Sequence, residues 1–142
     1  MAGASAIADG LVTLLSAASM FGSTGVSKDS YQVVETSTCS AVVRFVGLHS
    51  EAVGFGRPPD RQRTWQFNIK CYVRDLGDPQ STINRVWLCA DKVVSCLESD
   101  DTIQGTADRV DNIDVTHNPE RAETTGGGTW LTLEVVPNIV EL

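Results

Sequence analysis

The chain has few of the side chains that most enzymes use for catalysis or metal binding. It has two histidines, His49 and His117, and four cysteines with no C-x-x-C pair. Neither histidine has a sequence neighbour that marks a metal ligand or a general base, and no serine lies in a G-x-S-x-G or S-x-x-K motif. The sequence therefore predicts no catalytic residue, no metal site and no bound cofactor.

The four cysteines are too dispersed to indicate a disulfide framework. Cys39 and Cys71 fall in strand-like runs, while Cys89 and Cys96 are seven residues apart on a predicted helix. Seven helical residues rise by about 10 Å, which is too far for a disulfide bond. We favour four free thiols in a reducing cytosol, and a disulfide between the two strand cysteines is the alternative.

Basic residues and long apolar runs are both scarce. The 11 lysines and arginines are outnumbered by 18 aspartates and glutamates, which gives a formal charge of −7. Phosphate affinity is built from many Lys and Arg contacts, so this balance disfavours electrostatic binding to nucleic acid. The negative net charge fits a role in solubility alone, or an acidic wall along which DNA slides without binding. No apolar run approaches the roughly 18 residues of a membrane span, and the run at 11–20 lacks the basic segment of a secretory signal.

The spacing of apolar residues predicts two helices. One stripe near the N-terminus recurs at three- and four-residue steps and is expected to end around residues 22–25; it comprises Ile7, Leu11, Leu14, Leu15 and Ala18. A clearer helix over 79–99 begins with Asp78 as N-cap and Pro79 at the first helical position. Its apolar stripe comprises Ile83, Val86, Trp87, Ala90, Val93, Val94 and Leu97.

Strand signals fill most of the remaining chain. Residues 31–46 form a β-rich run whose polar middle, 37–40, allows one bent strand or two. The other expected strands are residues 65–74, 109–117 and 130–136. The polar stretch 118–128 ends in three glycines, but no Lys and no helix follow them, so it indicates a hairpin tip and not a phosphate-binding loop.

Together these elements predict an α+β fold in a single domain over residues 1–142. We expect an antiparallel or mixed sheet of about four strands with two helices packed on one face, in the order α-β-β-α-β-β. The expected core residues are Trp65, Phe67, Ile69, Val86, Trp87, Val94, Leu97, Leu131 and Leu133.

A long protruding loop is expected at residues 47–64, between the first two strands. A structureless loop of this length is uncommon inside a compact domain and is usually functional or disordered. The simpler interpretation is a flexible hairpin connection. The functional one is an arm that orders against a neighbouring subunit or points into a channel, with an aromatic anchor and with arginines for partner carboxylates. The residues assigned to this role are Phe55, Arg57, Asp60, Arg61 and Arg63.

Three aspartates, Asp108, Asp111 and Asp114, follow one another at a spacing of three. That spacing cannot place all of them on one side of a strand, and the glycine-containing loop with a terminal Glu that calcium prefers is absent. We interpret them as a solvated acidic edge and not as a metal site.

The order helix, β, long loop, β, helix, β, β includes the run WQFNIKCYVRD, which leads through LGDP into STINRVWLCADKVVSCLES. This layout resembles the tail-terminator and tail-completion proteins of long-tailed, siphovirus-like bacteriophages over nearly the whole chain, without a signature motif. The resemblance implies a structural virion protein of the tail or neck that is not an enzyme and that assembles in the host cytoplasm as a hexameric ring. Such a ring caps the tail tube and joins it to the head-side connector or stopper protein. DNA passes through its lumen without sequence-specific binding.

Two kinds of alternative remain open. Within the same class, the chain is a head-tail adaptor, a stopper or a tail-tube protein; a tube protein would stack into long cylinders, whereas a terminator stops at one ring. In a different class, it is a small ligand-binding domain or enzyme of cellular origin. A metal or nucleotide bound to the purified protein would favour that reading.

Overall fold

The computed structural model describes residues 3–17, 21, 26–28, 39–56, 58, 60–74, 77–123 and 129–142. The elements, in chain order, are α1 (Ala4–Ser16), β1 (Val26–Lys28), β2 (Cys39–Val53), β3 (Asp60–Arg74), α2 (Pro79–Ser99), β4 (Arg109–Glu123) and β5 (Thr129–Glu141).

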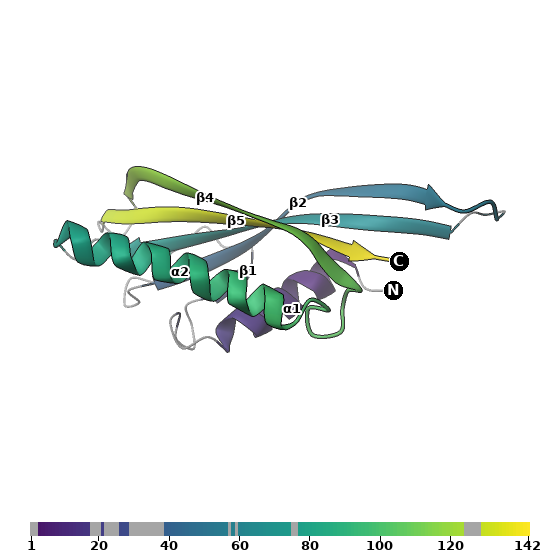
Figure 1. Ribbon diagram of the computed structural model, residues 1–142, viewed down its shortest axis with the longest axis horizontal. Helices are drawn as coiled ribbons and strands as arrows, with labels where there is room; N and C mark the ends of the chain where they lie inside the picture. Colours follow the sequence, from purple (N-terminus) through teal and green to yellow (C-terminus); the bar gives the residue numbers. More distant parts are fainter. Residues whose placement is uncertain are drawn as a thin grey trace.

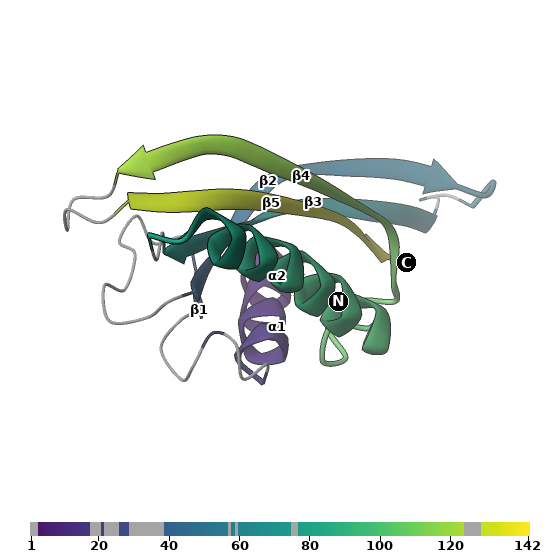
Figure 2. The same ribbon diagram turned by 60° about the vertical axis from the view of Figure 1, so that its left-hand side comes forward.

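The strands form one mixed sheet in the order β1-β2-β3-β5-β4. β1 runs parallel to β2, and the other neighbouring pairs are antiparallel. Both helices cover the same face of the sheet (Figures 1 and 2). The predicted α+β class is therefore confirmed, with five strands in the described part of the chain where about four were expected.

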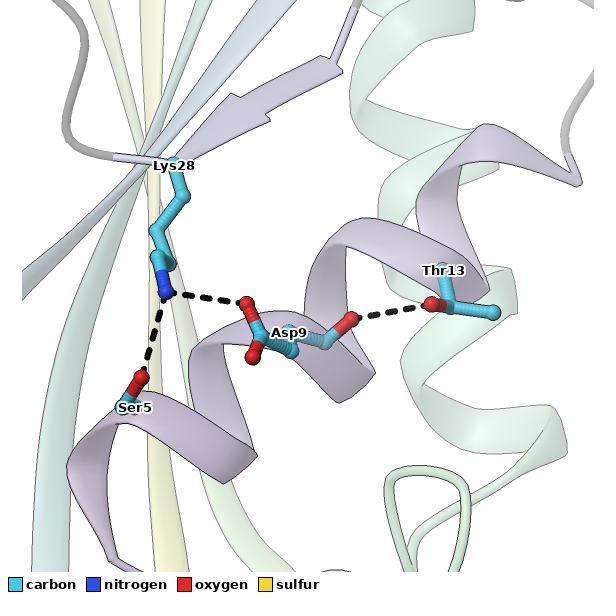
Figure 3. A network of polar contacts seen from close by, with 4 residues as sticks. All are labelled: Ser5, Asp9, Thr13 and Lys28. Atoms are coloured by element: carbon cyan, nitrogen blue, oxygen red, sulfur yellow. Dashed lines mark hydrogen bonds and ion pairs between the residues drawn. The ribbon is translucent and has the colours of Figure 1, made fainter.

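The additional strand is β1, which lies between the predicted N-terminal helix and the predicted β run that begins at residue 31. Lys28 ties β1 to α1, because its Nζ atom lies 3.0 Å from the Asp9 carboxylate and donates a hydrogen bond to Ser5 Oγ at 3.2 Å (Figure 3). Thr13 Oγ1 donates to the Asp9 carbonyl oxygen at 3.0 Å within the helix. A strand of three residues is too short to produce a periodic pattern.

Most of the expected core is buried between the helices and the sheet. β3 alternates as predicted, and its buried residues are Trp65, Phe67, Ile69, Cys71 and Val73. The buried stripe of α2 is Thr82, Val86, Cys89, Val93 and Leu97. The prediction for Trp87 is wrong, since its side chain is 57% exposed, and Val94 is only half-buried. Trp87 follows Val86 by one residue, which turns it about 100° away from the sheet.

The start of α2 is the one that the sequence predicted. The Asp78 carboxylate accepts hydrogen bonds from Gln80 N at 3.3 Å and from Ser81 Oγ at 2.7 Å. Pro79, which has no N–H to leave unsatisfied, occupies the first turn. These contacts satisfy donors that a helix N-terminus otherwise leaves open.

A compact turn after α2 returns the chain to the sheet. The Asp100 carboxylate accepts hydrogen bonds from Thr102 Oγ1 at 2.7 Å and from Gln104 N at 3.0 Å, and these bonds lower the pKa of Asp100. The turn buries Ile103 completely against α1, where a Cβ added at Gly10 would lie 2.7 Å from the Ile103 carbonyl oxygen. Gly10 therefore permits the close approach of two segments.

Several predicted boundaries are wrong. α1 ends at Ser16, short of residues 22–25. β4 continues to Glu123 because its backbone stays paired with β5, so residues 118–123 are strand and not turn. β5 continues past Pro137 to Glu141, because the proline sits at a shift in register with β4, where a missing N–H is tolerated. Of the predicted β run at 31–46, residues 31–38 lie outside the described residues, as do glycines 126–128 of the predicted tip.

Candidate assembly surface

The segment predicted as a loop at 47–64 is mostly a β-hairpin. β2 runs through Val53 and β3 begins at Asp60, with a continuous ladder between them, so the connection shrinks to residues 54–59. We call residues 44–66 the arm. It extends beyond the helices and the other strands, as Figure 1 shows. Past Ser50 and Arg63 it is a two-stranded ribbon, because the β3–β5 ladder ends at Arg63.

The error has a physical cause. A ribbon that projects from the sheet is wet on both faces, so its residues do not alternate between apolar and polar. The outer part of the arm is exposed over residues 48–56, and Gly54, Gly56 and Pro58 lie in the connection. Gly47 instead lies at the register shift between Phe45 and Gly47, where β2 has one extra residue.

Exposed apolar side chains line the base of the arm. Phe45 is 51% exposed and Leu48 is 46% exposed. Phe45 packs against Trp65 and Phe67 at ring-centroid distances of 5.9 and 5.8 Å. Its pairing with Phe67 places it on the helix-bearing face, past the point that the helices cover. The core therefore continues outward as an uncovered strip.

The predicted anchor and the arginines lie at the far end of the arm. Phe55 is fully exposed beside Gly54, whose φ of +95° makes the tip turn. Arg61 and Arg63 alternate in step with Trp65 on β3, so they point to the helix-bearing face. Arg63 lies 3.8 Å from Glu141, whose side chain is 5% exposed, while Arg61 is exposed.

The other two residues assigned to this arm differ in how they are placed. Asp60 is exposed and pairs with Val53 at the first rung of β3. Arg57 lies outside the described residues.

The predicted acidic edge lies at the start of β4, an outermost strand of the sheet. The Asp108 carboxylate accepts a hydrogen bond from Leu142 N at 2.6 Å. Arg109 Nε donates to Asp111 at 2.6 Å, and this bond raises the pKa of Arg109. Asp114 is exposed on the strand. The three aspartates share an edge without converging on one point, and no metal-binding cluster occurs among the described residues.

Next to this edge is a hollow that sequence reasoning missed. It has a volume of about 390 Å³ and lies between the end of α2 and the start of β4. Its walls combine apolar and acidic side chains, namely Leu97, Val110 and Ile113 with Glu98, Asp101 and Asp111. Glu98 and Asp111 are 13 positions apart in the sequence, and the turn after α2 brings them to the same hollow. No local sequence pattern could therefore have predicted the hollow.

The cysteines and histidines do not form a reactive centre in the described structure. All four cysteines are free thiols, and three are buried. A hydrogen bond with Cys89, together with burial, raises the pKa of Cys71 well above its ordinary value, which keeps that thiol protonated and inert. His49 is exposed on the arm 3.8 Å from Glu51, and His117 is exposed on β4.

No protein-family model and no curated protein matches this chain. Neither described helix has the length and apolar character needed to cross a membrane.

Proposed function

We propose that this protein is a structural component of a long-tailed bacteriophage, and that it forms a hexameric ring in the neck or tail that ends polymerisation of the tail tube. The observation that carries the proposal is the arm. The outer part of the arm, past Ser50 and Arg63, projects beyond the domain and contributes little to its core, while exposed apolar residues lie at its base and arginines near its tip. Surfaces of this kind are typical of assembly contacts.

The layout of the fold supports the same proposal. The resemblance to tail terminators implies a sheet with helices on one face and a long excursion between the first two main strands, and this chain has both. Its acidic balance also suits a passage for DNA, because six copies at −7 bring a formal charge of about −42 to a ring.

The mechanism that we propose is geometric. In a ring built from heterologous contacts, one patch of each subunit binds a different patch of its neighbour. A closed ring therefore leaves neither patch free. One face of the ring would then match the end of the tail tube, and the opposite face would match the head-side connector. Because the head-side face matches the connector and not the tube-side face of another ring, stacking stops after one layer.

Negative-stain imaging of the purified protein at micromolar concentration tests this function. Single closed rings that do not stack are the expected result. Long cylinders would indicate a tail-tube protein instead. Monodisperse monomers carrying a copurified metal or nucleotide would contradict the proposal and support the ligand-binding or enzyme alternative.

A further inference from the structure

Two strand edges of the sheet are open within the described structure. β1 pairs with β2 only at residues 41–43, and no described strand pairs with the outer edge of β2 from Phe45 to Val53. β4 is the last strand at the opposite side of the sheet, and no described strand pairs with its outer edge. Open edges are templates for pairing with another chain, and proteins usually block them.

The directions of the strands make the two edges compatible. β2, β3, β5 and β4 alternate in direction, because each pair is antiparallel. If the sheet of one copy continues into the next, the β4 edge therefore meets an antiparallel β2 edge. The register also places the start of β4 level with the base of the arm, since Arg109 aligns through Val140 and Thr64 with His49.

The charges of the two edges are opposite. Residues 44–66 contain four arginines and two carboxylates, whereas residues 98–114 contain six carboxylates and one arginine. Opposite potentials of this kind favour one partner and one register over others. Two identical edges would repel each other, so the pattern fits a head-to-tail contact.

The side chains match on the helix-bearing face as well. Phe45 and Leu48 of the arm are exposed there. Val110 of β4, which aligns with Leu48 through Ile139 and Trp65, is half-buried on the same face. Arg61 points to that face farther along the arm, and the hollow of Glu98 and Asp101 opens beside β4. The apolar side chains of the arm, with Arg61 beyond them, therefore complement the apolar side chains of β4, with the acidic hollow beside them.

We propose that the occupant of the β4 edge is the arm of a second copy of this chain, which adds antiparallel to β4 and directs Arg61 toward the carboxylates of the hollow. This inference rests on the proposed ring and assigns the contact that closes it. The arm then supplies one patch, β4 with the hollow supplies the other, and one continuous sheet passes from subunit to subunit.

Two charge-reversal variants test the contact. One variant carries Arg61→Glu on the arm, and the other carries Glu98→Arg with Asp101→Arg at the hollow. Each places like charges across the contact, so we expect the concentration needed for half assembly to rise at least about tenfold for each variant alone. An equimolar mixture should assemble as the wild type does, because each reversed arm then meets a reversed hollow, and each native arm a native hollow. Lys92→Glu, at an exposed position on α2, is the matched control and should assemble normally.

The outcomes separate this inference from the proposed function. Wild-type rings together with unaffected variants would overturn the contact and leave the ring standing. Variants that fail alone and also fail when mixed would show that the two surfaces do not face each other. A wild-type chain that stays monomeric would overturn the ring, and the contact with it. Circular dichroism and the midpoint of urea unfolding establish that each variant is folded.

Discussion

At the scale of single residues, the contact between Gly10 and Ile103 decides how closely α1 approaches the turn after α2. Gly10→Ala places a methyl group 2.7 Å from a backbone carbonyl oxygen. Overpacking costs about 1–3 kcal/mol, while alanine regains up to about 1 kcal/mol of helix propensity. We expect a net loss of about 1–2 kcal/mol in the free energy of unfolding, measured in urea.

Gly47→Ala is the control for that substitution, because no atom lies within 4 Å of a Cβ built there. It should change the free energy of unfolding by less than about 0.5 kcal/mol. A Gly10→Ala variant that is as stable as the wild type would mean that α1 and the turn are not in contact as described.

Asp100 makes the turn after α2 sensitive to acid. Hydrogen bonds from Thr102 and Gln104 hold the pKa of Asp100 below its ordinary value. A depressed carboxyl pKa stabilises the fold above the unfolded pKa of about 3.9, and this contribution is lost as the pH falls through the lower folded value. The free energy of unfolding of the wild type should therefore drop more between pH 5 and pH 3 than that of Asp100→Asn. Equal slopes for the wild type and for Asp100→Asn would contradict the role given to the Asp100 hydrogen bonds.

At the scale of elements, the orientation of α2 is the clearest test of the packing. Val86 is fully buried and Trp87 is mostly exposed. Val86→Ala should cost about 2 kcal/mol, because it removes two buried carbon groups at about 0.8 kcal/mol each and leaves a cavity. Trp87→Ala should cost less, about 1 kcal/mol, because most of its side chain is already exposed. The opposite order of urea midpoints would show that Trp87, and not Val86, faces the sheet.

The elements also show which features of the fold can be predicted from the sequence. β3 and α2 were predicted correctly because each has one buried face and one wet face, so their periodicities are visible in the chain. The arm was mistaken for a loop because neither face of its outer part is buried, and β1 was missed because three residues carry no period. The hollow depends on tertiary contact between α2 and β4, which no single segment encodes.

At the scale of the whole molecule, the arm should matter for assembly and not for the fold of the monomer. The triple variant Arg57→Ala, Arg61→Ala, Arg63→Ala should raise the concentration for half assembly by about tenfold or more, since charge-assisted contacts across an interface are lost. Its far-ultraviolet circular dichroism should stay unchanged, while its urea midpoint should fall because Arg63→Ala removes the ion-pair partner of the buried Glu141 carboxylate. Analytical ultracentrifugation measures the assembly, and ring formation equal to that of the wild type would remove the role assigned to these arginines.

The central claim is that copies of this chain close into one ring through two different surfaces. The most direct measurement is the mass of the purified 142-residue chain in solution at micromolar concentration, by native mass spectrometry. We expect a discrete species of about 92 kDa, six times the chain mass of 15.3 kDa, with no larger multiples. A single species at the mass of one chain, at every concentration reached, would contradict the central claim.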